Sequence, residues 1–566
     1  MQNGITLESL ACAGVSHRAA KAIVTCLDTM PAGPADAQWQ HLTREALTPA
    51  VPFAAHLLLH ETIYRGWDPA AGPPPAWSPT ERDIAESNIR SFCGTAGIPL
   101  ETLHEWSVRN RERFWQSIIK SLDISFATPP TSLLEPGSGV ESPVWLPGAK
   151  LNIATSCFKE RGDTPAVLYQ AAGGTIQRTT YDELDRLSNR VANALPAVGL
   201  GRGDAIAIAM PMTVEAVIAY LGIVKAGCVV VSIADSFAAD EIATRLRISG
   251  AKAVVTQDVT LRAGKKLPMY QKVIDAGAAR AIVVAAGDTM DVALRDGDLA
   301  WNEFLSDNES FDPVPCRPGD VSNILFSSGT TGEPKAIPWT HTTPIKCAMD
   351  GYLHHDIHPG DVVAWPTNLG WMMGPWLIYA SLINRGTIAL YYDAPTTPEF
   401  CRFIQDTKVS MLGLVPSLVK AWRSADTIGD FDWTGIKVFS STGEASNAED
   451  MLYLMSLAGY RPVIEYCGGT EIGGGYLSGS VVQPASPATF STVAFGLDMF
   501  VLDQDGRPCA NGEIFLVPPS IGLSDELLNR DHHEVYYEGT PTGPGGELLR
   551  RHGDQMERLG GGYYQA

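Results

Sequence analysis

The sequence predicts an α/β protein with two stacked α/β subdomains, a helical region before them and a small β-barrel-like subdomain after them. In the middle of the chain, short apolar runs alternate with segments of helix length. The first part shows helical patterns, and the last part shows short strands separated by turns. Together these sequence patterns indicate a layered α/β fold with added subdomains. The predicted boundaries are 1–139 for the helical region, 140–490 for the large domain, and 491–566 for the small β subdomain with the end of the large domain.

Helices are expected throughout the first region. Residues 78–81 read Ser-Pro-Thr-Glu, which predicts a helix start with a hydroxyl cap, proline at the first helical position and a carboxylate that returns to the cap. A stretch rich in Pro, Gly and Ser over 127–139 predicts the boundary of the region. Another helix is predicted from large apolar residues whose spacing places them on one face: Phe114, Trp115, Ile118 and Ile119.

Two sets of short apolar runs predict the sheets of the large domain. The first set is 205–209, 229–231 and 253–255, and their composition without alternation indicates parallel strands covered on both faces. Two such layers imply a cleft between them. After about Thr492, turn signals at Asp505-Gly506 and Asn511-Gly512 predict a small antiparallel subdomain. The second set of parallel strands is expected at 362–365, 388–391, 409–412 and 437–439.

Composition limits the functional classes. The chain has 566 residues, of which 45% are hydrophobic and 19% charged, which is ordinary for a globular protein. A formal net charge of −21 argues against broad contact with nucleic acid or anionic lipid. Ten cysteines without a C-x-x-C pair, and no secretory start, predict reduced thiols in a cytosol-like compartment. The longest uncharged stretch, 369–384, is shorter than the roughly 20 residues of a membrane span and predicts a buried helix.

The segment Ser327–Lys335, with the sequence SSGTTGEPK, is the most informative part of the chain. An apolar strand runs into it, so it begins at the carboxyl end of a strand, where open α/β sheets bind ligands. Gly329 and Gly332 permit a backbone whose N–H groups converge on an anion, while hydroxyls and the lysine add donors. The spacing is not that of a Walker loop. A phosphate cradle is therefore predicted, and the alternative is a solvated turn before a lysine.

The loop resembles the signature of the adenylate-forming superfamily, which includes acyl-CoA synthetases, adenylation domains of peptide synthetases and luciferases. The resemblance extends over about 140–566. Residues 103–106, 114–115 and 145–152 are similar to the amino-terminal region of acetyl-CoA and acetoacetyl-CoA synthetases, which narrows the branch to CoA ligases. Further motifs follow in the family's order: Thr180–Leu184, Lys225–Cys228, Gly443-Glu444, Gly469-Thr470-Glu471 and His552-Gly553-Asp554. Residues 365–374 and 465–471 most resemble plant-type peroxisomal acyl-activating enzymes and their bacterial relatives.

The resemblance implies an ATP-dependent acyl-CoA synthetase that uses Mg²⁺ and CoA. An acid first attacks the α-phosphorus of ATP, giving an acyl-adenylate and pyrophosphate, and the CoA thiol then attacks the acyl carbon. Thr470, Glu471 and Lys335 are the expected catalytic residues, with Thr470 at the α-phosphate and Glu471 on Mg²⁺. The alternative for the Thr470-Glu471 pair is a solvated strand end. Asp554 is expected on the ribose, and its alternative is a turn aspartate after Gly553. The other nucleotide-binding residues that the resemblance implies are Ser327, Ser328, Gly329, Thr330, Thr331, Gly332, Gly443, Glu444, Glu465, Tyr466 and Cys467.

Two departures from the family pattern affect the expected pockets. Cys467 stands where many relatives stack an aromatic ring on adenine, and Tyr466 is expected to compensate. Gly468 stands where acetyl-CoA synthetases close the acyl pocket with tryptophan, which predicts an acid larger than acetate. The expected acyl pocket is Trp371, Met372, Met373, Gly468 and Gly469, and the alternative for its Trp-Met-Met run is core packing. His354, His355 and His358 have a spacing compatible with metal ligation, but a solvated loop is the expectation.

Two other functions remain open at this point. An adenylation module would load its acyl group on a carrier protein, and a non-catalytic protein would only bind nucleotide. The expected partners are a carboxylic acid, ATP and CoA, without nucleic acid or a membrane span. The expected location is cytoplasmic for a bacterial-type protein and peroxisomal for a eukaryotic one. The resemblance also implies a mobile carboxy-terminal domain after the last residue, so the chain is expected to be truncated and impaired in the complete reaction.

Overall fold

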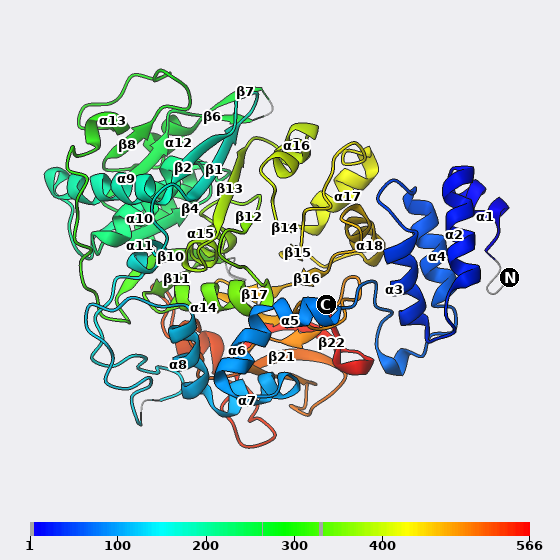
Figure 1. Ribbon diagram of the computed structural model, residues 1–566. Coiled ribbons are helices and arrows are strands. Elements are labelled where there is room, and N and C mark those ends of the chain that lie inside the picture. Colours follow the sequence, from blue (N-terminus) through cyan, green and yellow to red (C-terminus); the bar gives the residue numbers. More distant parts are fainter. Residues whose placement is uncertain (1–4, 138, 263, 328–331) are drawn as a thin grey trace.

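The computed structural model describes residues 5–137, 139–262, 264–327 and 332–566. Figure 1 shows a small helical module at one side, two sheets flanked by helices, and a further sheet close to the carboxyl end of the chain. Each of the two large sheets has seven strands, and a four-stranded sheet belongs to the last part of the chain. The architecture confirms the predicted α/β class with a helical beginning and a small β subdomain.

The first helices form a module that docks on the large domain. Trp39 is buried, and its indole N–H donates to the carbonyl of Ala76 at 2.9 Å. His56 Nδ1 lies 2.8 Å from the hydroxyl of Tyr460, close to α18 (Ala448–Leu457), beside which the module sits in Figure 1. Burial lowers the pKa of His56 to about 4, so the ring is neutral near pH 7. The module consists of α1 (Leu7–Cys12), α2 (His17–Thr29), α3 (Ala35–Glu45) and α4 (Phe53–Ile63).

A second group of helices packs on the small β subdomain. α5 (Glu81–Glu86) starts later than predicted, because Thr80 is the cap and exchanges hydrogen bonds with Asp83. This capping box satisfies two backbone donors that Ser78 and Glu81 were expected to satisfy. On α8 (Arg111–Ser121), three of the four predicted face residues are buried, and the fourth is half-buried. The remaining helices are α6 (Asn88–Ala96) and α7 (Leu103–Arg109).

The first large sheet has the order β11-β10-β4-β3-β5-β8-β9. Its strands β3, β4, β5 and β8 run parallel and are buried on both faces, as composition predicted for the first three of them. β10 ends at Ser327 and pairs antiparallel with β11, which begins at Lys335. The bounds are β3 (Ala205–Ala209), β4 (Val229–Ile233), β5 (Ala253–Gln257), β8 (Ala281–Val284), β9 (Leu299–Ala300), β10 (Val321–Ser327) and β11 (Lys335–Thr340), with α10 (Val214–Lys225), α11 (Ala239–Ser249) and α12 (Met269–Asp275) between them.

The second large sheet has the order β16-β15-β14-β12-β13-β1-β2. β1 precedes the whole first sheet in the chain, yet it pairs parallel with β13, with Val167 opposite Ile388. The two sheets are therefore interleaved in sequence. The uncharged stretch forms α15 (Met373–Ile383), every residue of which is buried, as expected. The bounds are β1 (Pro165–Ala171), β2 (Gln177–Thr180), β12 (Val362–Ala364), β13 (Thr387–Tyr392), β14 (Met411–Leu414), β15 (Val438–Ser441) and β16 (Val463–Glu465), with α9 (Tyr181–Ala194), α14 (Thr343–Met349), α16 (Pro398–Asp406) and α17 (Pro416–Ala425).

The expectation of a solvated loop at the histidines is wrong for two of them. A π-helical turn, Asp350–His354, follows α14; His354 is its last residue, His355 comes directly after it, and both rings are buried. His354 Nδ1 lies 2.9 Å from the carbonyl of Gly479, and His355 Nε2 lies 3.0 Å from Ser440 Oγ. Burial lowers the pKa of His354 to about 3 and that of His355 to about 4. Both are therefore neutral core residues that connect α14 to the sheets.

The last part of the chain forms antiparallel sheets. Asp505-Gly506 makes the predicted turn, but the turn predicted at Asn511-Gly512 is wrong, because both residues belong to β21. A Cβ on Gly512 would lie 2.2 Å from the carbonyl oxygen of Leu502, so glycine permits the close approach of β20 there. The bounds are β17 (Cys467–Gly469), β18 (Gly474–Ser478), β19 (Thr492–Val493), β20 (Asp498–Leu502), β21 (Asn511–Val517), α19 (His532–Tyr536), β22 (Arg550–Arg558) and β23 (Tyr564–Gln565).

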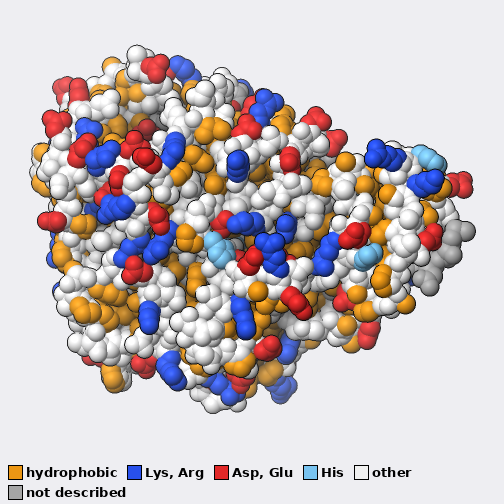
Figure 2. Space-filling view, in the orientation of Figure 1, with side chains coloured by type: hydrophobic (Ala, Val, Ile, Leu, Met, Phe, Trp, Pro, Cys, Tyr) orange, Lys and Arg blue, Asp and Glu red, His pale blue; other side chains and the backbone are white. Residues whose placement is uncertain are grey.

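The surface carries charges of both signs. Figure 2 shows basic and acidic side chains interspersed over this face, with apolar side chains scattered among them. Within the described ranges, no helix combines the length and the apolar character needed to cross a membrane.

Candidate active site

A cavity of about 900 Å³ lies where strand ends from both large sheets meet. Met212 and Asp235 come from just beyond β3 and β4 of the first sheet. Trp365, Val415 and the segment 441–446 follow β12, β14 and β15 of the second sheet. The carboxyl ends of parallel strands are where α/β folds place ligands. The cavity is large enough for a ligand of several rings.

Most of the predicted site residues meet at this cavity. Glu471 and Lys335 lie outside its wall but close to one another. Ser327 and Gly332 flank the part of the phosphate loop whose residues Ser328, Gly329, Thr330 and Thr331 lie outside the described residues. The predicted residues in the wall are Trp371, Met372, Met373, Gly443, Glu444, Glu465, Tyr466, Cys467, Gly468, Gly469, Thr470 and Asp554.

Lys335 and Glu471 form the charged corner of the site. Lys335 begins β11, Glu471 follows β17, and the ammonium lies 3.8 Å from the carboxylate. Burial opposes ionisation of Glu471, but the charges of His552 and Lys335 outweigh it and lower its pKa. A single ionised carboxylate next to the predicted phosphate loop matches the needs of Mg²⁺, which takes one or two carboxylates with phosphate oxygens and water. The residues therefore fit the implied metal.

Asp554 lies at the centre of a polar group on the nucleotide side. The hydroxyl of Tyr476 donates to Asp554 Oδ2 at 2.7 Å, and His552 Nε2 lies 3.4 Å from the same oxygen. The thiol of Cys467 approaches it at 3.7 Å. Burial opposes ionisation of Asp554, but the contacts with His552 and Tyr476 outweigh it and lower its pKa. An ionised aspartate in this position is an acceptor for ligand hydroxyls.

Tyr466 is tied into the core. Its hydroxyl donates to Asp350 Oδ2 at 2.5 Å and accepts from the indole N–H of Trp376 at 3.1 Å. Asp350 also pairs with the buried Lys346, whose ammonium lies 2.6 Å from its other oxygen. A Cβ on Gly475 would lie 2.5 Å from the Tyr466 ring, so β18 covers that ring closely. This arrangement gives no support to the idea that Tyr466 replaces the missing aromatic residue at position 467.

The two glutamates at the adenine side differ in environment. Glu444 accepts from the backbone N–H and the hydroxyl of Ser417, both at 3.0 Å, and so caps α17. Glu465 is buried; its Oε2 accepts from Ser446 at 2.8 Å, while Oε1 has no hydrogen-bond partner among the described residues. Burial raises the pKa of Glu465 to about 7, against the hydrogen bonds of Ser446 and Ser441. An unpartnered buried oxygen at a cavity wall is a reason to expect a ligand donor there.

The acyl side contains the predicted apolar residues and one contradiction. Trp371 is 52% exposed and packs edge-on against Phe237, with ring centroids 5.9 Å apart. A Cβ on Gly468 would lie only 2.0 Å from the carbonyl oxygen of Gly474, because β17 and β18 approach each other closely there. A tryptophan at 468 does not fit this backbone, so the absence of an indole at Gly468 does not by itself account for the larger acid that was expected from it. On Gly469, a Cβ would lie 2.8 Å from Glu471 Oε2.

Sequence reasoning missed three residues around the charged corner. Tyr476 bonds to Asp554, while Tyr536 and Arg550 pack beside Lys335 and Glu471. None of the three belongs to the family motifs named above. The available signals were the Tyr536-Tyr537 pair and the unusual basic pair Arg550-Arg551 directly before the ribose motif.

Comparisons with known proteins agree on the family. The profile described as AMP-binding enzyme matches residues 154–521, and that of the acetyl-coenzyme A synthetase N-terminus matches 100–157. Residues 2–65 match the profile described as probable acyl-activating enzyme 17/18, SAM domain.

Relatives and a solved structure extend these matches. The chain is 44% identical to the protein of Arabidopsis thaliana named probable acyl-activating enzyme 17, peroxisomal, over 100% of this chain and 82% of that protein. It is also 44% identical to the hexanoyl-CoA synthase of Cannabis sativa, over 93% of this chain and 77% of that protein. The acetoacetyl-CoA synthetase from Streptomyces lividans superposes with a TM-score of 0.80 at 26% identity, covering 87% of this chain and 80% of that one. With the cavity, the charged corner and the ordered motifs, these matches establish that the chain belongs to the AMP-binding enzyme family.

Proposed function

We propose that this chain is an ATP-dependent acyl-CoA synthetase, an acid–thiol ligase. It joins a carboxylic acid larger than acetate to CoA and converts ATP to AMP and pyrophosphate through an acyl-adenylate. The observation that carries the proposal is the cavity of about 900 Å³, which brings the polar segment Glu465–Thr470 and Asp554 together with Trp371 and Met372. Family membership and relatives named as acyl-activating enzyme and CoA synthases support it.

In the first step, the acid's carboxylate attacks the α-phosphorus of ATP and pyrophosphate leaves. The attacking acid is already ionised near neutral pH, so the protein's main task is to position anions and offset their charge. Lys335 donates to the β- and γ-phosphates, and the hydroxyl of Thr470 donates at the α-phosphate. Asp554 accepts from the ribose hydroxyls. Glu471 would hold Mg²⁺, which, when bound, offsets phosphate charge and orients the phosphate oxygens.

In the second step, the CoA thiol attacks the acyl carbon of the adenylate, and AMP leaves with the bonding electron pair. The thiol proton goes to solvent. No cysteine of this chain is needed as a covalent carrier, and burial raises the pKa of Cys467, the cysteine in the wall, to about 12. That thiol is therefore a poor nucleophile near pH 7.

We further propose that Glu465 contributes to recognition of the base. Glu465 lines the same cavity as Gly443, and its buried Oε1 has no hydrogen-bond partner among the described residues. A nucleotide amino group would satisfy this oxygen, which otherwise carries the cost of an unmade hydrogen bond.

The proposed acid has an aliphatic chain of medium length. Trp371 and Met372 give an apolar wall, and methionine adapts to flexible chains. One relative is named hexanoyl-CoA synthase, which is a statement about that protein but supports an acid of this class here. Two plant relatives are named as peroxisomal, which supports a peroxisomal location if the source is eukaryotic.

Pyrophosphate release and product analysis test the proposal. A panel of straight-chain acids, from acetate upward, is supplied with ATP and Mg²⁺, and the acceptor is either CoA or a carrier protein. We expect pyrophosphate release that depends on the acid and a CoA thioester as product. An acyl-carrier product instead favours the adenylation module, and ATP binding without acid-dependent pyrophosphate release favours a non-catalytic protein. Lys335→Ala, which removes a donor worth about 1.5–3 kcal/mol from the phosphate site, is the negative control.

A further inference from the structure

A segment far from the phosphate loop in sequence holds the backbone on both sides of Lys335. Asn529 Oδ1 accepts from the N–H of Ala336 at 3.0 Å, and its amide donates to the carbonyl of Pro334 at 2.9 Å. Leu528 N–H donates to the carbonyl of Ala336 at 3.1 Å. Leu528 and Asn529 thus hold the backbone before and after the lysine. The position of the lysine side chain depends on other contacts.

Tyr536, at the end of α19, lies beside that side chain. The Lys335 ammonium is 5.0 Å from the centre of the Tyr536 ring and 3.4 Å from its hydroxyl. The ring is only 3% exposed, so the contact is largely shielded from water. The hydroxyl accepts a hydrogen bond from the ammonium, and a cation near a desolvated aromatic ring is also attracted by the ring's quadrupole.

The same ring contacts a second, anchored cation. The Arg550 guanidinium carbon lies 4.2 Å from the centre of the Tyr536 ring, and this side chain is fully buried. Arg550 donates to the carbonyl of Glu471 at 3.3 Å and to Ser524 Oγ at 2.7 Å. Ser524 N–H donates to that carbonyl too, at 2.8 Å. The ring is therefore fixed to the backbone of the residue whose carboxylate faces Lys335.

The distance between Lys335 and Glu471 is informative in this setting. Their charged atoms are 3.8 Å apart, whereas a direct charge-assisted hydrogen bond is about 2.7–2.9 Å long. A buried carboxylate and a flexible lysine would be expected to close that gap. The contact of Lys335 with Tyr536 competes with this closure, so the ammonium stays between the ring and the carboxylate.

We propose that Tyr536 is a positioning residue that holds Lys335 off Glu471 and in reach of the terminal phosphates of ATP. This inference rests on the proposed function, which assigns Lys335 to the β- and γ-phosphates. Without the ring, Lys335 pairs directly with Glu471, and the pair is lost both to the phosphates and to Mg²⁺. The ring therefore keeps a cation and an anion apart until a ligand separates them.

Nucleotide binding by the whole chain tests this, with calorimetric titrations of ATP and of AMP in parallel. Tyr536→Leu should weaken ATP binding by roughly 3- to 10-fold, the effect of one cation–ring contact, and raise the Mg²⁺ concentration at half-saturation. AMP has no β- or γ-phosphate, so its affinity should stay within about twofold. Tyr536→Phe keeps the ring but removes the hydroxyl that accepts from Lys335, so its ATP affinity should fall between those of wild type and Tyr536→Leu. Tyr537→Leu, which changes the buried tyrosine next to Tyr536, is the matched control. It should change neither the affinity for ATP relative to AMP nor the Mg²⁺ concentration at half-saturation.

A double-mutant cycle with Lys335→Met separates positioning from folding. If Tyr536 acts through the lysine, Tyr536→Leu has no further effect on ATP binding in the Lys335→Met background. Equal losses of affinity for ATP and AMP in Tyr536→Leu, or an undiminished effect of Tyr536→Leu in the Lys335→Met background, would overturn the inference. Lys335→Met without effect on ATP contradicts the loop assignment itself, whereas an impaired Lys335→Met beside a normal Tyr536→Leu overturns only the role of Tyr536.

Discussion

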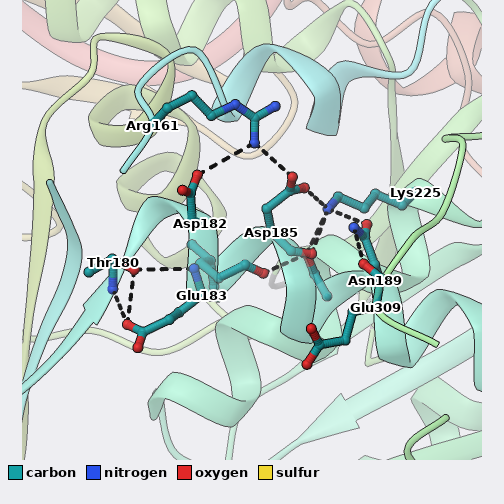
Figure 3. A network of polar contacts seen from close by, with 10 residues as sticks. Arg161, Thr180, Asp182, Glu183, Asp185, Asn189, Lys225 and Glu309 are labelled. Carbon is teal, nitrogen blue, oxygen red and sulfur yellow. Dashed lines mark hydrogen bonds and ion pairs between the residues drawn. The ribbon is translucent and has the colours of Figure 1, made fainter. Parts of the chain in front are cut away.

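Lys225 at the end of α10 and Asp185 on α9 form a buried ion pair, with 2.5 Å between Nζ and Oδ1. Figure 3 shows the lysine reaching into a ring of acceptors. Ser188 Oγ and Asn189 Oδ1 accept from the same ammonium, both at 2.8 Å, and Lys225 is only 1% exposed. Burial opposes ionisation of Asp185, but Lys225 and Arg161 outweigh it and lower its pKa. The first residue of the Lys225–Cys228 motif is thus bound to α9 just after the Thr180–Leu184 motif, and this contact joins α9 to α10.

Lys225→Met should destabilise the fold strongly. Removing one partner of a buried pair costs about 3–5 kcal/mol, and we expect the lower end because the Asp185 side chain remains 25% exposed. The matched control is Lys252→Met, which breaks an equally short pair with Asp204 at a side chain that is 57% exposed and should cost less than about 1 kcal/mol. Urea denaturation measures both. Equal midpoints for the two variants would contradict the buried character of the Lys225 pair.

Glu465→Gln should change how stability depends on pH. Folding raises the pKa of Glu465 from 4.5 to about 7, so the native state favours the protonated form. Its destabilising contribution is absent below pH 4.5, grows as pH rises, and is complete above about 7, where it reaches roughly 3 kcal/mol. Relative to the wild type, Glu465→Gln should therefore gain stability between pH 5 and 8. Parallel pH–stability curves for the two proteins would show that this carboxyl ionises normally in the native state.

Gly468→Ala should lower stability and leave the acid preference unchanged. The added methyl group would meet the carbonyl oxygen of Gly474 at 2.0 Å, and overpacking of this kind costs about 1–3 kcal/mol. Gly435→Ala, where no atom lies within 4 Å of the new Cβ, serves as the control. Thermal unfolding and pyrophosphate release over the acid panel measure the two effects. A stable variant with a shifted acid profile would restore the view that this position faces the acyl group.

Glu471→Gln should raise the Mg²⁺ requirement more than it weakens the nucleotide site. The amide keeps the size of the side chain but removes the anion that suits a hard cation. Magnesium titrations of nucleotide binding compare the variant with Glu449→Gln, which changes an exposed glutamate paired with Arg423. Superimposable titrations for wild type and Glu471→Gln would remove Glu471 from the metal site.

The sheets and the polar side of the cavity could be predicted because they depend on local patterns. Buried parallel strands have apolar runs, and the phosphate and metal motifs are contiguous, so their residues stay together in any fold. The helix start at Thr80 was misplaced because two overlapping hydroxyl–carboxylate pairs compete and only the observed one satisfies both backbone donors. His354 and His355 were misread because burial depends on what packs over a polar residue, which in this case is a turn and a strand end far along the chain.

The contacts that sequence reasoning missed around the site depend on how strands and helices pack together. Whether a side chain fits at Gly468 depends on how closely β18 pairs with β17, and this distance cannot be read from the local sequence. Tyr536 and Arg550 reach the lysine corner only because α19 and β22 return to it. Predicting such contacts requires the tertiary fold, whereas residues that share one contiguous motif can be grouped from the sequence alone.

The pairing of β1 with β13 has a consequence for how the chain is made. Val167 leaves the ribosome about 220 residues before its partner Ile388, which at roughly 5–20 residues per second is a delay on the order of tens of seconds. During that time, the entire first sheet can be synthesised and can fold while one edge of β1 has no partner. An unpaired strand edge is a template for association with other chains. A nascent polypeptide of this design is therefore most exposed to aggregation in the middle of its synthesis, and chaperones that bind extended apolar strands would act there.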